Sequence, residues 1–173
     1  MKLKLISIVT IVSLVALISL NNSVENYVDE QIDNVEESVQ SIVYNSKEKI
    51  AATKKEIDCL ARNIYYESRS EPYEGKVAVA NITINRLKDG RWGNDLCRVI
   101  FSKYQFSWTL YRNKEPYGSA WQESIDIAKE AINGMRVTGL EEAQYYHANY
   151  IKQPRWTRAK QKVQEIGKHI FYI

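Results

Sequence analysis

Glu67 and Glu71, two glutamates four residues apart, are the side chains of this 173-residue sequence with the clearest potential for chemistry. They lie where the first predicted helix of the C-terminal part ends, so both carboxyl groups project from one helical face. The chain also has 12 tyrosines and 4 tryptophans, enough to build apolar walls. Such a wall raises the pKa of a carboxyl group, which then serves as the general acid that glycosidic cleavage needs. Taken alone, such a pair is more often simply solvated.

Other chemistries lack their sequence signatures. The only histidines are His147 and His169, and the chain has neither a His-Glu-x-x-His motif nor a Cys-x-x-Cys pair. There is no Gly-x-Ser-x-Gly elbow of a serine hydrolase and no glycine-rich phosphate loop. The sequence therefore predicts no metal and no cofactor, and leaves carboxylate chemistry.

The elements that must position the glutamates follow from hydrophobic periodicity. A helix is predicted from residue 57 up to Pro72, because the residue before a proline is pushed out of the α region. Further helices are predicted over residues 72–86, 96–101 and about 121–132. Residues 144–147 and 169–173 are rich in aromatic and β-branched side chains and are predicted to be extended. These elements indicate an α+β domain, mainly helical with a small β-sheet.

The N-terminal third is of a different kind. Residues 1–20 begin with two lysines, followed by a run of 16 uncharged residues, a pattern between a signal peptide and a minimal membrane anchor, with the N-terminus in the cytoplasm. It also resembles the signal-anchor-release segments of some phage lysozymes. Residues 21–56 carry an apolar stripe of heptad type and predict an acidic helical stalk, either a homodimeric coiled coil or a single amphipathic helix. Whether residues 1–20 are a signal peptide or an anchor, the C-terminal part of the chain is expected to be exported.

The charge of the predicted domain is mildly positive. Residues 57–173 hold 18 basic and 13 acidic residues, an excess of +5. This excess suits an acidic polymer or surface, but it lacks the dense basic stripe of a nucleic-acid footprint. No nucleic-acid partner is expected.

Several motifs of the C-terminal part resemble those of the SleB-type cell-wall hydrolases, which include spore-cortex lytic enzymes and phage endolysins. The first is Tyr65-Tyr66-Glu67-Ser68-Arg69 within residues 61–81. The others follow in the family's order, at residues 85–86, 97–101, 105–108, 131–134, 145–147, 154–156 and 166–172. The resemblance covers essentially all of residues 57–173 and none of residues 1–56.

The resemblance implies a lysozyme-like fold and an enzyme that degrades peptidoglycan. Family members cleave the bond between N-acetylmuramic acid and N-acetylglucosamine, commonly as lytic transglycosylases, and their catalytic acid matches Glu67. Glu71 is either a second catalytic carboxylate, as in a hydrolytic muramidase, or a supporting residue. The alternative to an enzyme is a membrane-tethered peptidoglycan-binding protein without catalysis. A phage endolysin and a bacterial wall-remodelling enzyme both fit.

Substrate contacts are expected from aromatic and polar residues of the motifs, with a structural role as the alternative for each. These residues are Tyr66, Arg69, Gln105, Trp108, Tyr146, His147 and Trp156. Cys59 and Cys97 are the only cysteines, and export places them in an oxidising space. They are expected either to form a disulfide or to remain two buried thiols.

Overall fold

The computed structural model describes residues 20, 22–31, 41–111 and 113–173. The chain divides into two units, residues 1–40 and residues 41–173. In the first unit, residues 22–31 are helical, and Val24 and Val28 of the apolar stripe are exposed. None of the described helices combines the length and apolarity needed to cross a bilayer. The membrane segment predicted at residues 1–20 lies, apart from Leu20, outside the described residues.

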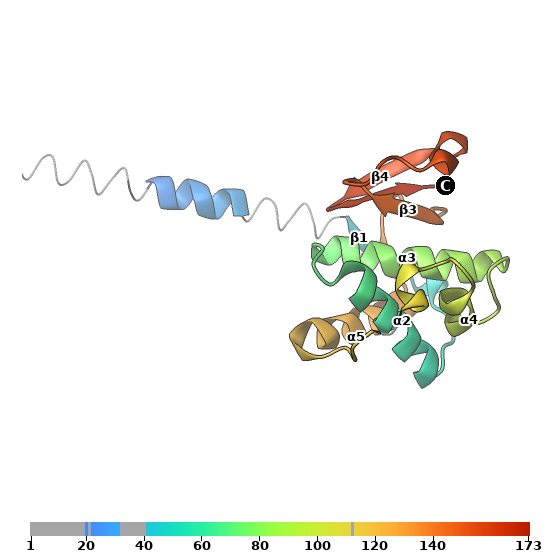
Figure 1. Cartoon of the computed structure of the whole chain (residues 1–173). Helices are drawn as coiled ribbons and strands as arrows, with labels where there is room; N and C mark the ends of the chain where they lie inside the picture. The colour runs from blue at the N-terminus through green and yellow to red at the C-terminus, as the bar shows by residue number, and fades with distance from the viewer. Residues whose placement is uncertain (1–19, 21, 32–40, 112) are drawn as a thin grey trace, which may run out of the picture. The chain divides into compact units, whose positions relative to one another are not determined.

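The second unit is built mainly from helices. Its described residues form four α-helices, α2 (Lys54–Ser68), α3 (Tyr73–Asp89), α4 (Leu96–Phe101) and α5 (Gly118–Ile132), and three short 3₁₀ helices, η1 (Ser46–Glu48), η2 (Ser107–Leu110) and η3 (Arg155–Ala159). Figure 1 shows α3 between the other α-helices and a small sheet. This position explains why every residue of α3 from Gly75 to Arg86 is buried.

The two ends of α2 are set by its sequence. Thr53 and Glu56 form a capping box, in which the Thr53 hydroxyl accepts from the Glu56 N–H and the Glu56 carboxylate accepts from the Thr53 N–H. The helix ends at Ser68, earlier than expected, and the short turn before Pro72 carries Glu71. Glu67 therefore lies in the last turn of α2, whereas Glu71 lies beyond it.

Two small antiparallel sheets complete the domain and confirm the mixed helical and sheet architecture. The first pairs β1 (Ile42–Tyr44) with β2 (Met135–Val137). The second has the order β3-β5-β4, formed by β3 (Tyr145–Ala148), β5 (His169–Tyr172) and β4 (Lys162–Ile166). The predicted extended stretches correspond to β3 and β5, while β1, β2 and β4 were not expected.

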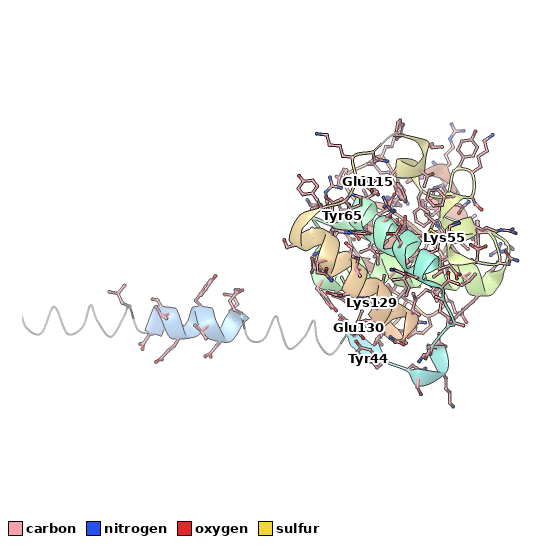
Figure 2. The ribbon with its side chains drawn as sticks, turned by 90° about the horizontal axis from the view of Figure 1, so that it is seen from below. Tyr44, Lys55, Tyr65, Glu115, Lys129 and Glu130 are labelled. Atoms are coloured by element: carbon pink, nitrogen blue, oxygen red, sulfur yellow. A yellow bond between two sulfur atoms is a disulfide. The ribbon has the colours of Figure 1, made fainter. Side chains whose placement is uncertain are left out.

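Strand β1 corrects the expected helical stalk. Residues 41–56 were expected to end that stalk, but they begin the compact unit, and residues 42–44 pair with β2. The Tyr44 hydroxyl also donates to Glu130 of α5 at 2.6 Å, and Figure 2 shows the two side chains together. Pairing with a strand more than 90 residues away is invisible to local periodicity, which is why the sequence suggested a continuous helix.

A disulfide joins Cys59 of α2 to Cys97 of α4. It spans a sequence separation of 38 residues. Closing a loop of this size lowers the entropy of the unfolded chain and so stabilises the folded domain by about 3–4 kcal/mol. Both helices also contribute to a small buried cluster of Cys59, Ile100 and Phe106. The covalent link therefore fixes the helix that carries Glu67 against the segment leading to η2.

Candidate active site

The carboxyl group of Glu67 faces the three-stranded sheet. Its Oε2 accepts a hydrogen bond of 2.9 Å from the hydroxyl of Tyr146 in β3. Tyr146 packs against the rings of His169 and Phe171 on β5, and these three side chains share one face of the sheet. The site is thus built where the end of α2 meets the inner face of the sheet.

The environment of Glu67 favours its protonated form. Burial raises the pKa of the Glu67 carboxyl, because a charged carboxylate loses its hydration there. The hydrogen bond from Tyr146 and the positive charge of Arg86 act in the opposite direction and only moderate the rise. A carboxyl group that stays protonated above its ordinary range is what a general acid requires.

Tyr146 is itself held as a proton donor. Burial raises the pKa of its hydroxyl well above 10, and the neighbouring Glu67 carboxyl raises it further. The hydroxyl is therefore protonated at all physiological pH values, so the bond to Glu67 runs from Tyr146 Oη to Oε2. Since Oε2 is engaged as an acceptor, Oε1 is the oxygen available to present a proton to a substrate.

Arg86, in the last turn of α3, is a functional candidate that was not expected from the sequence. Its side chain is 6% exposed, and its Nε donates to the carbonyl oxygen of Gln144 at 2.8 Å. The guanidinium lies over the Phe106 ring, 5.0 Å from its centroid, and Nη1 has no hydrogen-bond partner among the described residues. This buried cation is the counter-charge available when Glu67 loses its proton. Its position as the last inward residue of a predicted helix was the available sequence signal.

Glu71 has a different environment, although it is only four residues away. It is 8% exposed, and its Oε2 accepts from the backbone N–H of Lys168 at 2.7 Å. Lys168 lies in the turn between β4 and β5, next to Gly167, whose φ of +56° is in the left-handed region. A side chain at Gly167 would collide with the Glu71 carboxylate. Glu71 therefore holds the β4–β5 turn against the end of α2.

The predicted contacts Tyr66 and Trp108 form a pair of stacked rings, with centroids 4.6 Å apart. The Trp108 indole N–H donates to Asn63 Oδ1 at 2.8 Å, and the Tyr66 hydroxyl donates to the carbonyl oxygen of Lys114 at 2.5 Å. Both Trp108 and Tyr146 pack against the Cys59, Ile100 and Phe106 cluster. This shared cluster brings the stacked pair and the Glu67 site to one side of the domain.

The sheet separates His147 and Trp156 from Glu67. Successive strand residues point to opposite faces, so Tyr145 and His147 lie on the face away from Tyr146. On that outer face His147 Nε2 is 3.0 Å from the Tyr172 hydroxyl, and the Trp156 ring packs against His147 and Tyr172. His147 and Trp156 therefore lie on the opposite face of the sheet from Tyr146 and Glu67, and their expected contact with substrate stays a prediction.

Two further candidates, Arg69 and Gln105, contact residues other than Glu67. Arg69 is exposed, and its guanidinium lies 5.2 Å from the ring centroid of Tyr65. Gln105 is half-buried beside Phe106, and its backbone N–H donates to Ser102. Among the described residues, no cluster of three or more histidine, cysteine or acidic side chains has the arrangement of a metal site.

The chain is similar to known proteins over most of this domain. Residues 70–172 match the family model described as Cell Wall Hydrolase, a match that begins just after Glu67. The spore cortex-lytic enzyme of Bacillus subtilis (strain 168) is 34% identical over 116 residues, which are 67% of this chain and 37% of that enzyme. The spore cortex-lytic enzyme of Oceanobacillus iheyensis is 35% identical over 120 residues, 67% of this chain and 41% of that enzyme. The chain thus spans about two fifths of the length of these relatives.

Two solved structures share the fold. The catalytic domain of the Bacillus cereus SleB protein aligns with a TM-score of 0.59 and 28% identity, covering 75% of this chain and 98% of that domain. The catalytic domain of the germination-specific lytic transglycosylase SleB from Bacillus anthracis has the same TM-score with 30% identity, covering 71% of this chain and 98% of that domain.

Proposed function

The chain belongs to the Cell Wall Hydrolase family, and from this membership we propose that it cleaves peptidoglycan outside the cytoplasm, with Glu67 as its catalytic acid. The proposed bond is the one between N-acetylmuramic acid and N-acetylglucosamine, and the proposed reaction is that of a lytic transglycosylase. The observation that carries the proposal is the half-buried Glu67 carboxyl, whose pKa is raised by burial and whose Oε2 is held by Tyr146. A glutamate at the end of a helix facing a small sheet also fits a lysozyme-like arrangement.

In this mechanism Glu67 acts twice. Its Oε1 proton is transferred to the glycosidic oxygen, the bond from that oxygen to the anomeric carbon breaks, and the N-acetylglucosamine hydroxyl leaves. The resulting carboxylate then takes the proton of the muramoyl 6-hydroxyl as that oxygen bonds to the anomeric carbon. The products are an ordinary sugar end and a 1,6-anhydromuramic end, and no water is consumed.

The protein's own groups support both steps. Tyr146 fixes the orientation of the carboxyl group, so the proton on Oε1 is directed to one place. When Glu67 becomes a carboxylate, the Tyr146 hydroxyl and the charge of Arg86 stabilise it. The stacked rings of Tyr66 and Trp108 are proposed to bind sugar faces beside the reacting bond.

A single catalytic carboxylate is favoured over two. Hydrolytic glycosidases use a pair of carboxyl groups separated by roughly 5–9.5 Å across the bond. Glu71 is the second glutamate of the motif, but its carboxylate already accepts a hydrogen bond from the Lys168 backbone N–H. It also lies so close to Gly167 that no side chain would fit between them. It is therefore proposed to support the site and not to activate water or attack the sugar.

The experiment that tests this function is mass spectrometry of the sugar products released from purified peptidoglycan, with the full chain and its Glu67→Gln variant in parallel. The expected result is anhydromuramic ends with the wild-type chain and none with the variant. Ordinary reducing ends would overturn the transglycosylase mechanism and favour a muramidase. New amino-acid ends would indicate an amidase, and wall binding without any release would leave only the binding-protein alternative.

The location is part of the proposal. Residues 1–20 are proposed to direct export as a signal peptide or membrane anchor, so that residues 57–173 face the wall. The stalk that precedes the domain, and its ability to dimerise, remain predictions. Fractionation of a C-terminally tagged full chain after export distinguishes a retained anchor, which stays in the membrane pellet, from a cleaved or released segment.

A further inference from the structure

The positive charge of the domain is concentrated in one short stretch. Residues 149–162, here called the basic segment, contain five lysine or arginine residues and no aspartate or glutamate. The rest of residues 57–173 carries 13 basic and 13 acidic residues and is neutral. The entire +5 excess of residues 57–173 therefore comes from these 14 residues. Like charges packed this closely repel one another, and a bound polyanion relieves the repulsion.

The basic segment is held in place by apolar side chains while its cations face solvent. It contains η3, in which Thr157 is buried and the Trp156 ring packs against the outer face of the sheet. The five cations differ in how they are engaged. Lys160 lies over the Tyr145 ring at 3.8 Å, and Lys162 forms an ion pair with Glu165 at 2.9 Å.

The other three cations, Lys152, Arg155 and Arg158, are exposed. None of them forms an ion pair with another residue in the described part of the chain. Two neighbouring apolar side chains, Tyr150 and Ile151, are 76% and 47% exposed. The segment thus presents unpaired guanidinium and ammonium groups on a fixed support.

This surface is distinct from the Glu67 site. Trp156 anchors the basic segment to the sheet face that carries His147 and Tyr172, whereas Tyr146 and Glu67 meet on the opposite face. The thickness of one sheet separates the two regions. A ligand on the basic segment would therefore hold a part of the polymer other than the bond being cleaved.

We propose that the basic segment binds the carboxylates of the peptides attached to peptidoglycan, through Lys152, Arg155 and Arg158. The inference rests on the proposed function, since the substrate itself then brings the anions to the enzyme. Arginine guanidinium groups bind carboxylates in bidentate geometry, and two of the three cations are arginines. The basic segment serves retention on an insoluble, multiply charged wall, while Glu67 and its neighbours carry out the cleavage.

The test is a pelleting assay with insoluble peptidoglycan from which phosphate-containing polymers have been removed by acid. The full chain carries Glu67→Gln throughout, so that the wall is not consumed. The test variant is Lys152→Gln, Arg155→Gln and Arg158→Gln combined. The control combines Lys47→Gln, Lys54→Gln and Lys103→Gln, three exposed cations elsewhere in the domain, and has the same net charge.

The expected result is a roughly tenfold increase in apparent Kd for the test variant and no comparable change for the control, because exposed ion pairs are individually weak but add up over three sites. Converting the wall carboxylates to amides is expected to raise the apparent Kd of the chain without the three substitutions by the same factor. The apparent Kd of the test variant is expected to stay unchanged. In the Glu67-containing chain, cleavage of a soluble glycan without peptides is unchanged by the three substitutions.

Two outcomes would overturn the proposal. Equal binding by the test and control variants would show that the basic segment is not a docking surface. An apparent Kd that is unchanged by amidation but falls when phosphate polymers are left on the wall would show that the surface binds phosphate groups instead. Neither outcome depends on catalysis, so failure here is separate from failure of the product analysis.

Discussion

Glu67 and Glu71 are the same residue type, four positions apart, yet their surroundings give them opposite properties. Glu67 is half-buried in the last turn of α2, and its partner is a side-chain hydroxyl whose proton stays on the tyrosine. Glu71 is more deeply buried, but a backbone N–H of the β4–β5 turn donates to it. The backbone hydrogen bond gives Glu71 a structural role, whereas burial raises the pKa of Glu67, despite the bond from Tyr146, and suits it to the proposed acid role. Depth of burial alone does not distinguish the two.

The largest expected effect comes from removing the acid. Glu67→Gln preserves the shape of the side chain and an oxygen that accepts from Tyr146, but it removes the transferable proton. Release of soluble wall fragments is expected to fall by about 10²–10⁴-fold. Circular dichroism and thermal unfolding check that the variant is folded. A folded variant with undiminished activity would refute the assigned role.

The matching change at the other glutamate acts on stability. Glu71→Ala removes the acceptor of the Lys168 N–H, a partly buried hydrogen bond, and the free energy of unfolding is expected to fall by about 1–3 kcal/mol. Below its melting temperature the variant retains activity of the same order as wild type. The measurement is chemical denaturation combined with a wall-release assay. Glu142→Ala, at an exposed glutamate, is the control and is expected to stay within about 0.5 kcal/mol.

Comparison of Tyr146→Phe with Tyr145→Phe sharpens the contrast between the two faces of the sheet. Loss of the Tyr146 hydroxyl removes the group that lowers the pKa of Glu67, so this pKa rises further. Because the acid must be protonated, the alkaline limb of the pH–rate profile moves to higher pH. The maximal rate falls by about tenfold, as expected for one hydrogen bond to a charged group. Tyr145→Phe, on the outer face, is expected to leave the limb in place. A shift of the limb to lower pH in Tyr146→Phe would contradict the assigned hydrogen bond.

The smallest expected effect is a pH-dependent gain in stability. The pKa of Glu67 is higher in the folded chain than in the unfolded chain, so its contribution to stability is complete below the ordinary value of 4.5 and is lost as pH rises through the raised value. Glu67→Gln has no group to ionise at this position, so it does not bury a charge at neutral pH. Its melting temperature is therefore expected to match wild type at acid pH and to exceed it at neutral pH. A gain of the same size at both pH values would show that titration is not its cause.

Much of the fold was accessible from the sequence because its signals are local. The predicted helix at residues 96–101 coincides with α4, and the aromatic and β-branched stretches became β3 and β5. Strands β1 and β2 have three residues each and pair over a long separation, so no periodicity marks them. Strand β4 is mostly polar and has no clear apolar alternation, and it pairs with β5, which lies beside it.

Less of the candidate site than of the fold could be predicted from the sequence. Glu67 was singled out by its motif, and Tyr146 was placed near the substrate without its bond to Glu67. Arg86 lies in one of the motifs and at the end of a predicted helix, but its part in the site could not be predicted, because it depends on which residues pack around it. The separation of His147 from Tyr146 was available in advance, since adjacent residues of a predicted strand point to opposite faces.

The Cys59–Cys97 disulfide makes the stability of this domain depend on the compartment in which the chain resides. Cytoplasmic thiols are kept reduced, so a chain that has not yet been exported lacks this covalent contribution. Under the proposed export the same chain acquires the link between α2 and α4 without any change in sequence. The helix that ends in Glu67 is thus held less firmly where the chain is synthesised than where the wall lies.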